Sequence, residues 1–250
     1  MAAERPVDDA HPPLLLAVET SGRMPSVALL RGAELLAERQ GARERPGAES
    51  LLPAVNDVLV LAGARVADVD AFAVSIGPGS FTGLRVGIAT VKGLAFGTGQ
   101  LVAAVSSLAA LARAAPESGD PVVALLDARR DEFYAASFRV SGPDRDPAPG
   151  DLAAGVYTPA ELIERLPSRC VLVGEGVALC GPRLREGLGA GIVLGPAIEP
   201  RARDVGALGG RLLGEGAGVA AADLVPRYLR RAEAEVRRTG HRFEEAPPVR

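Results

Sequence analysis

A glycine-rich stretch, Gly77–Gly83, is the first place where this sequence could perform chemistry. It follows an apolar run of strand length, Asp70–Ile76, and precedes a helical pattern. A glycine loop between a strand and a helix gathers free amides at the positive end of the helix, where phosphates bind. Capping of the helix by Ser80 or Thr82 explains the same residues equally well. The candidate phosphate-binding residues are Gly77, Gly79, Ser80 and Thr82.

The loop is not one of the common nucleotide motifs. It lacks the Gly-Lys-Ser/Thr ending of a P-loop, and Lys92 lies more than a turn into the helix. The spacing of its glycines differs from that of a dinucleotide fingerprint, and Pro78 removes one amide donor. Any anion bound here would therefore be held differently from those in the common motifs.

Two acidic residues end strands at matching places in the two halves of the chain. Glu19, followed by Thr20 and Ser21, could hold a hydrated Mg²⁺ and a phosphate, although such a trio is also ordinary turn chemistry. Asp127, followed by Ala128 and Arg129, reads by itself as hairpin-turn chemistry. Together, the two acidic strand ends suggest a cleft between two lobes.

Several classes of function are excluded by composition. The chain has 250 residues and a formal net charge of −3, whereas a general nucleic-acid coating requires a basic excess. The histidines, His11 and His241, lie near the ends, which excludes a histidine-ligated metal centre or a Ser-His-Asp triad inside the fold. Cys170 and Cys180 are too few for a disulfide scaffold or a four-cysteine zinc site. The apolar runs are too short to span a membrane, and residues 1–13 do not resemble a secretory signal. We therefore expect a cytoplasmic protein with a disordered leader.

The elements that position these residues read as two similar halves. The first half begins with an antiparallel meander and continues with alternating helices and strands; the second half repeats this order from Val122. Predicted strands cover Leu14–Val18, Ser26–Leu30, Glu34–Arg39, Asp70–Ile76, Gln100–Val105, Val122–Ala128, Glu132–Val140, Cys170–Val173 and Ile192–Leu194. Predicted helices cover 50–62, 84–96, 107–114, 158–166, 179–188 and 204–213, and 141–151 is expected to be loop.

This order predicts four parts of the chain. They are a leader (1–13), an N-terminal lobe (14–106), a C-terminal lobe (107–228) and a flexible tail (229–250).

Two predicted helices carry more packing surface than one core needs. The helix from Ser50 is apolar around most of its circumference, which fits either burial on two sides or a surface shared with a partner. Its Pro53 requires Ser50 to cap the helix, since proline is tolerated only in the first turn. The helix 84–96 contains Gly87 and Gly93, and interior glycines predict close approach by the sheet or by a second helix.

Four segments resemble the TsaB (YeaZ) family. They are Leu14–Leu30, Ala71–Gly97 with the signature GPGSFTGLR, Leu125–Tyr134, and Pro226–Arg230. The resemblance implies an α/β protein with an actin-like ATPase (sugar kinase/Hsp70/actin) fold of two ribonuclease-H-like lobes. It also implies a role in making N6-threonylcarbamoyladenosine at position 37 of tRNAs that read codons beginning with A.

The same resemblance implies a set of partners. In that system a TsaB protein is a non-catalytic partner of the catalytic paralogue TsaD, and the ATPase TsaE joins them. The first-lobe helices would pack against TsaD, or against a second copy when the protein is alone, and tRNA would be met only through the complex. The interface residues expected here are Leu51, Leu52, Val55, Leu59, Arg85, Val86, Gly87, Thr90 and Gly93.

The sequence departs from the family pattern in two places. The first strand ends in Glu19 where relatives usually carry Asp, and Gly47-Ala48-Glu49 stands where many relatives read His-Ser-Glu. TsaD-like members bind a metal through a histidine pair in that helix region, and this chain has no equivalent. We therefore expect no metal site, no catalytic residues and no required cofactor.

Two other functions remain as alternatives. The first is an actin-fold phosphotransferase that uses Glu19, the Gly77–Gly83 loop and Asp127 around Mg²⁺ with ATP or ADP, although no base or nucleotide-clamping lysine is evident. The second is direct tRNA binding by the segment Arg227–Arg250, which holds seven arginines against four glutamates.

Overall fold

The computed structural model describes residues 12–41, 47–142 and 144–230. The predicted leader and tail lie largely outside these residues. The chain forms two compact units. One contains the described residues up to Ala110 together with Pro200–Pro226, and the other contains Leu111–Glu199 and the described residues from Arg227.

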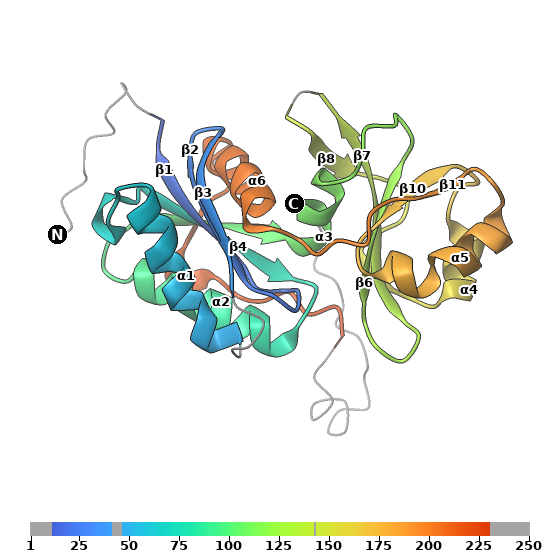
Figure 1. Ribbon diagram of the computed structural model, residues 1–250, viewed down its shortest axis with the longest axis horizontal. Coiled ribbons are helices and arrows are strands. Elements are labelled where there is room, and N and C mark those ends of the chain that lie inside the picture. The colour runs from blue at the N-terminus through green and yellow to red at the C-terminus, as the bar shows by residue number, and fades with distance from the viewer. Residues whose placement is uncertain (1–11, 42–46, 143, 231–250) are drawn as a thin grey trace. The chain divides into compact units, whose positions relative to one another are not determined.

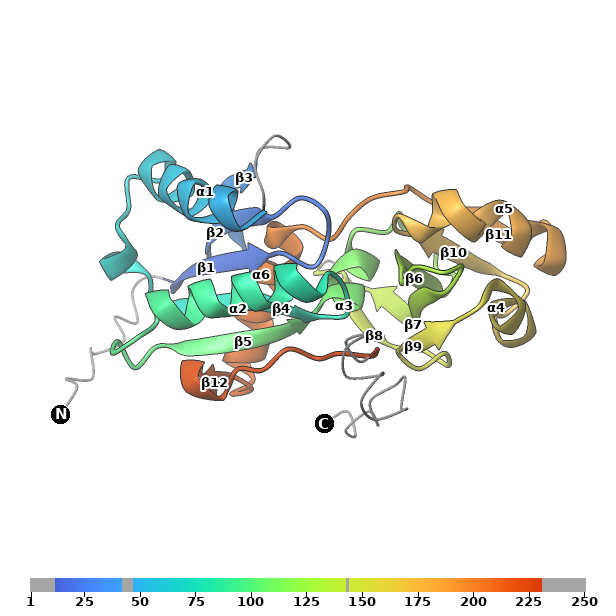
Figure 2. The same ribbon diagram turned by 90° about the horizontal axis from the view of Figure 1, so that it is seen from below.

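The first unit is built on a six-stranded sheet in the order β12-β5-β4-β1-β2-β3. β1 pairs antiparallel with β2 and parallel with β4, which is in turn parallel to β5. Figure 2 shows the short strand β12 beside β5 at one edge. The elements of this unit are β1 (Leu14–Glu19), β2 (Ser26–Arg31), β3 (Glu34–Gln40), α1 (Gly47–Leu61), η1 (Val66–Asp68), β4 (Ala71–Gly77), α2 (Phe81–Leu94), β5 (Leu101–Ser106), α6 (Ala202–Gly214), β12 (Val219–Ala220) and η2 (Ala221–Asp223).

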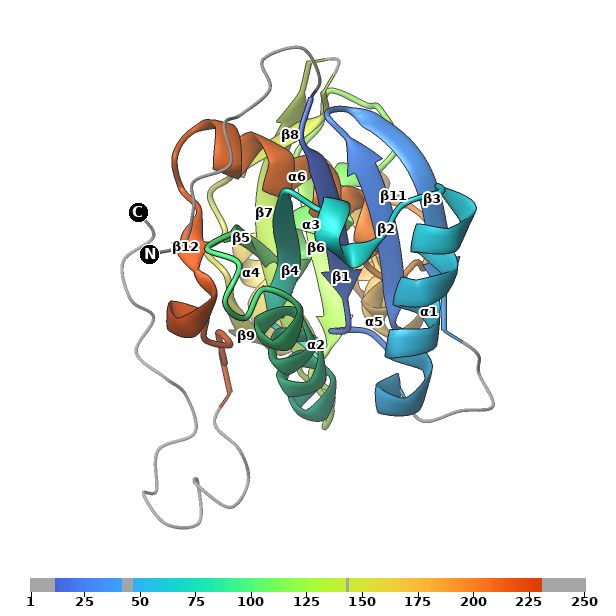
Figure 3. The same ribbon diagram turned by 90° about the vertical axis from the view of Figure 1, so that its left-hand side faces the viewer.

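Both faces of this sheet are covered, so its central strands are continuously apolar. Along β1, the side chains of Leu14, Leu16 and Val18 join a core with α1 and α2. The alternate residues Leu15 and Ala17 join a second core with α6. Figures 1 and 3 show α1 and α2 on one face and α6 on the other.

The second unit repeats the same topology. Its main sheet has the order β11-β10-β6-β7-β8, in which β6 is antiparallel to β7 and parallel to β10. α4 and α5 pack with the sheet in one core. Its elements are β6 (Val122–Asp127), β7 (Phe133–Ser141), β8 (Asp146–Pro149), β9 (Gly155–Tyr157), α4 (Pro159–Arg165), β10 (Cys170–Val173), α5 (Gly176–Leu188) and β11 (Ile192–Leu194); α3 (Ser107–Arg113) spans the division between the units. The matching strand orders confirm the predicted α/β fold of two ribonuclease-H-like lobes.

The predicted lobe boundary is wrong for the helix near residue 204. We assigned it to the second lobe, but α6 packs on the sheet of the first unit. Two glycines allow this approach: a Cβ at Gly206 would lie 3.1 Å from the Ala17 Cβ, and one at Gly209 would lie 2.4 Å from the Ala73 Cβ. A helical pattern shows which residues are apolar, but it does not show which of two sheets will cover them.

Several element boundaries also differ from the prediction. α1 begins at Gly47, so Ser50 lies inside the helix and is not its cap, and Pro53 lies within the continuous helix on its exposed side. Part of the expected loop at 141–151 forms β8, and α5 begins three residues before its predicted start. Short edge strands such as β8 and β9 are stabilised by pairing with β7, which a local pattern does not reveal.

Candidate functional site

The loop after β4 is the beginning of a capped helix. Ser80 precedes α2, and its Oγ accepts a hydrogen bond of 3.2 Å from the amide of Gly83. Thr82 lies exposed in the first turn of the helix and is not the cap. Gly77 and Gly79 have φ values of 118° and 155°, which only glycine adopts readily. The capping interpretation of this loop is therefore confirmed.

Glycines of this loop and of α2 allow the turn after β1 to approach closely. A Cβ at Gly83 would lie 2.0 Å from the Thr20 carbonyl oxygen, and one at Gly87 would lie 2.2 Å from Thr20 Oγ1. A Cβ at Gly79 would lie 2.5 Å from the Ser21 carbonyl oxygen. We predicted that a sheet or a second helix approaches α2. The element found there is the β1–β2 turn, which brings the two sequence-predicted clusters together.

This packing disfavours an anion at the loop. The Ser80 amide donates to the Ser21 carbonyl oxygen at 2.8 Å, and the Gly83 amide is used by Ser80 Oγ. The Ser21 carbonyl oxygen lies at the Ser80 amide, where it would repel the charge of an approaching phosphate. Two of the amides at this end of α2 are therefore already used within the protein.

Glu19 is completely buried at the end of β1. Its Oε1 accepts a hydrogen bond from the Ser21 amide. Burial raises the pKa of its carboxyl group, and nearby hydroxyls of Ser21 and Ser75 only partly oppose that rise. Because a raised pKa favours the neutral acid over the carboxylate, burial works against Mg²⁺ binding by Glu19.

Three buried side-chain oxygens in this cluster have no partner at hydrogen-bond geometry within the described residues. They are Glu19 Oε2, Thr20 Oγ1 and Ser21 Oγ. All three residues are at most 5% exposed, so these oxygens are closed in beneath the turn. Within the same described residues, no group of three or more His, Cys, Asp or Glu side chains could hold a metal ion.

Asp127 belongs to the second unit and is engaged in its own hairpin. Its Oδ1 accepts a hydrogen bond of 2.7 Å from the Arg129 amide, and its own amide donates to Glu175 Oε1 at 3.3 Å. These contacts are the hairpin-turn chemistry that the residues alone suggested.

The two cysteines are also unsuited to catalysis. Burial raises the pKa of the Cys170 thiol to about 11 and that of the Cys180 thiol to about 12. Both therefore stay protonated at neutral pH and are poor nucleophiles.

The predicted interface residues divide into accessible and inaccessible ones. Leu51, Val55 and Leu59 lie in the core of their own unit, and Gly87 is covered by Thr20, so these four predictions are wrong for a free surface. Leu52, Arg85 and Gly93 are exposed, whereas Val86 and Thr90 are partly buried. A helix that is apolar all round does not show which side its own sheet will cover.

An exposed apolar surface nevertheless remains on α1 and α2, which lie side by side (Figures 1 and 3). On α1, Leu52, Val60 and Leu61 are 57%, 68% and 55% exposed. At the end of α2, Phe96 is 87% exposed, and a Cβ at Gly93 would meet nothing described within 4 Å. We name this surface the α1–α2 face; it comprises Leu52, Val60, Leu61, Arg85, Ala89, Gly93 and Phe96. Sequence reasoning missed Val60, Leu61, Ala89 and Phe96, although the surplus of apolar residues in α1 indicated a second contact surface.

Comparison with known families places these features in context. Residues 42–165 match the family model described as TsaD, tRNA N6-adenosine threonylcarbamoyltransferase. The chain is 32% identical over 223 residues to the tRNA threonylcarbamoyladenosine biosynthesis protein TsaB of Escherichia coli, covering 86% of this chain and 94% of that protein. It is 43% identical over 122 residues to the protein of the same name from Haemophilus influenzae, covering 48% of this chain and 51% of that one.

A solved structure shows the same likeness. It is described as an uncharacterized protein from Pseudomonas aeruginosa with similarity to peptidase YeaZ. Its sequence is 33% identical, the alignment covers 87% of this chain and all of that one, and the TM-score is 0.77. As for the membrane, no helix in the described residues combines the length and apolar character needed to cross one.

Proposed function

This chain belongs to the TsaB (YeaZ) family, and from that premise we propose that it is an accessory subunit of the assembly that makes N6-threonylcarbamoyladenosine in tRNA. The observation that carries the proposal is the α1–α2 face: a chain of this family leaves large apolar side chains exposed on α1 and just after the end of α2 in its first unit. Large exposed apolar side chains on neighbouring elements are one mark of a protein interface.

The occupant that we propose for the α1–α2 face is the catalytic paralogue TsaD. The match of this chain to the TsaD family model supports a common fold for the two proteins, so equivalent helices could meet across the interface. A second copy of this chain would cover the same face when TsaD is absent. TsaE would join the assembled pair, and tRNA modification would require all three.

The chain itself supplies no threonylcarbamoyl-transfer centre in this proposal. Burial raises the pKa of the Glu19 carboxyl group, and the Ser80 and Gly83 amides of the glycine loop already donate to the Ser21 carbonyl oxygen and to Ser80 Oγ. We therefore propose that it needs neither a metal nor a bound nucleotide of its own. No observation favours the alternative of an independent ATP-dependent phosphotransferase.

Reconstitution tests the proposal. Purified threonylcarbamoyl-adenylate synthase, TsaD and TsaE from the same organism are incubated with unmodified tRNA, with and without this chain. We expect modified adenosine only when the chain is present, and none from the chain alone. Equal modification in its absence would refute the accessory role. A separate ATP-hydrolysis assay of the isolated chain should give no rate above background.

A further inference from the structure

The turn that joins β6 to β7 has an unusual backbone. Arg129, Arg130 and Asp131 are consecutive and all left-handed, with φ values of 68°, 60° and 57°. L-residues other than glycine avoid this region because Cβ crowds the following carbonyl oxygen. A run of three such residues persists only where the surrounding structure enforces it, and backbone strain of this kind is concentrated at functional sites.

Contacts within the turn enforce part of this conformation. The Ala128 amide donates to the Glu132 carbonyl oxygen at 2.9 Å, and the Glu132 amide donates to the Arg129 carbonyl oxygen at 3.1 Å. At the base of the turn, Asp127 Oδ1 accepts from the Arg129 amide at 2.7 Å. The backbone of the turn is thus closed by its own hydrogen bonds.

Two arginines from distant parts of the second unit brace the turn from outside. Arg183 of α5 forms a two-pronged pair with Asp131, with one nitrogen–oxygen distance of 3.0 Å. Arg230 donates to the Ala128 carbonyl oxygen at 2.6 Å and pairs with Glu132. Both acidic residues at the end of the turn are therefore neutralised by arginines of the same unit.

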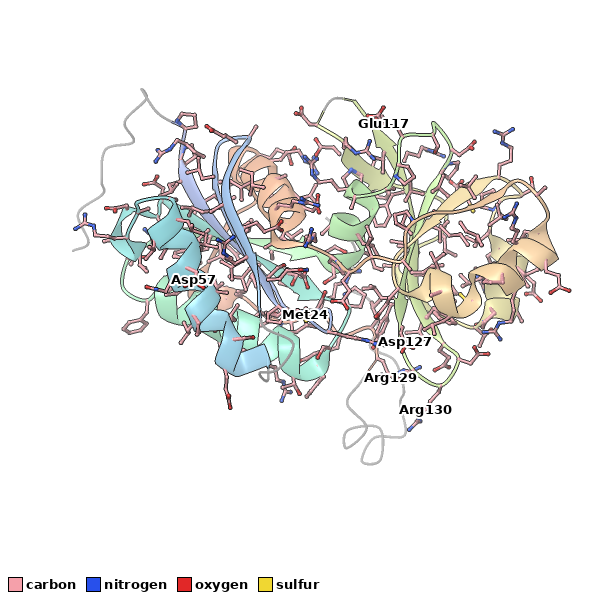
Figure 4. All side chains as sticks on the ribbon, viewed as in Figure 1. Met24, Asp57, Glu117, Asp127, Arg129 and Arg130 are labelled. Atoms are coloured by element: carbon pink, nitrogen blue, oxygen red, sulfur yellow. The ribbon has the colours of Figure 1, made fainter. Side chains whose placement is uncertain are left out.

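The side chains exposed on this turn include two arginines. Arg129 and Arg130 are exposed, and the Arg129 side chain is 82% accessible. The Arg129 Nε lies 3.9 Å from Oδ2 of Asp127, and so exposed an ion pair contributes little. Figure 4 shows Arg130 at the end of the hairpin, pointing away from the sheet.

Guanidinium groups held on a rigid turn suit phosphate oxygens. Arginine offers a planar fork of donors that matches phosphate geometry, and a fixed backbone lowers the entropy lost on binding. The proposed function supplies a phosphate-rich ligand, since its substrate is tRNA. It also assigns the protein partner to the α1–α2 face, which belongs to the other unit.

We propose that Arg129 and Arg130 bind the phosphodiester backbone of tRNA while it is held by the assembly. This inference rests on the proposed function and extends it, because it gives the chain a direct contact with RNA. The contact would position the tRNA without reading its sequence, since phosphates carry no base information. The segment considered earlier for tRNA binding lies mainly outside the described residues, and the inference uses only its Arg230, which braces the turn.

The test measures binding of an unmodified tRNA transcript by the reconstituted assembly at several salt concentrations. Arg129→Gln and Arg130→Gln are each compared with Arg169→Gln, a matched control on the same unit. Arg169 has a 74% exposed side chain and pairs with a single carboxylate, that of Asp120, at 3.4 Å. We expect each turn variant to bind tRNA about tenfold more weakly, with the slope of log affinity against log salt reduced by about 1. The control should bind as the wild type does.

A second variant separates binding from folding. Glycine adopts the left-handed conformation without strain, so Arg130→Gly should raise the melting temperature of the chain and still weaken tRNA binding. A higher melting temperature with unchanged tRNA affinity would overturn the inference.

The remaining outcomes distinguish this inference from its premise. If the turn variants bind tRNA as tightly as Arg169→Gln, the inference fails although the accessory role stands. Loss of TsaD association, with tRNA affinity retained, would also overturn it. If the assembly modifies tRNA equally well without the wild-type chain, it is the proposed function that fails.

Discussion

Replacement of Leu52 by aspartate should weaken TsaD binding, and this tests whether the α1–α2 face is the surface that binds TsaD. Leu52 is 57% exposed on α1, so a partner that covers it removes a little over half of a leucine side chain from water. At ~2 kcal/mol for full burial, that contact contributes about 1 kcal/mol. An unpaired carboxylate in the same place adds a desolvation cost of about 2 kcal/mol or more. The sum of about 3 kcal/mol corresponds to a loss of TsaD affinity of roughly 100-fold.

Titration calorimetry of the chain with TsaD measures this loss, and sedimentation of the isolated chain reports self-association. Leu179→Asp is the matched control, because Leu179 is 52% exposed on a helix of the other unit. Both variants should melt within a few degrees of the wild type, since both side chains face solvent. Equal loss of TsaD binding in the two variants, or none in Leu52→Asp, would refute the assignment of the interface.

Other predictions concern folding. Gly87→Ala should destabilise the first unit by about 1–3 kcal/mol because its Cβ would lie 2.2 Å from Thr20 Oγ1, and Thr20→Ala in the same chain should recover part of that loss in a denaturant-unfolding cycle. Gly206→Ala should lower the melting temperature, since its Cβ would lie 2.3 Å from a leucine methyl of β2. Gly93→Ala should instead stabilise the first unit by about 0.5–1 kcal/mol, because its Cβ would meet open space. Because the pKa of Glu19 is raised, the folded state binds the Glu19 proton more tightly than the unfolded state does. The stability that the protonated side chain contributes is therefore present below pH 4.5, the ordinary value, and declines as the pH rises through the raised pKa. Glu19→Gln should therefore gain stability relative to the wild type as the pH rises from 4 to 8. A difference in melting temperature between the two proteins that stays constant over that range would contradict the raised pKa of Glu19.

Much of the fold is determined locally. The apolar runs of β1, β4 and β6 are typical of strands buried on both faces, and the repeated order of strands and helices predicts two similar lobes. Ser80 and Thr82 stand where a helix cap is expected, so capping could be predicted from the sequence, and the structure assigns it to Ser80. These features depend on neighbours within a few residues, which the sequence displays directly.

The accessible part of the α1–α2 face depends on packing at a distance. The sequence shows that α1 has more apolar surface than one core requires, but the choice between Leu51, which is buried, and Leu52, which is exposed, is made by the sheet beneath the helix. Similarly, Gly87 and Gly93 are alike in sequence, yet one touches Thr20 and the other meets open space. Only the folded arrangement distinguishes them.

The sequence by itself determined the family, the fold class and the residues whose side chains could take part in binding or catalysis. Tertiary structure decided which of those residues are available. It placed α6 on the first sheet, closed the glycine loop with the carbonyl oxygens of Thr20 and Ser21, and fixed the turn at Arg129 through arginines distant in the sequence. The physical reason is that local patterns specify which surfaces an element has, whereas long-range packing decides which of those surfaces remain exposed.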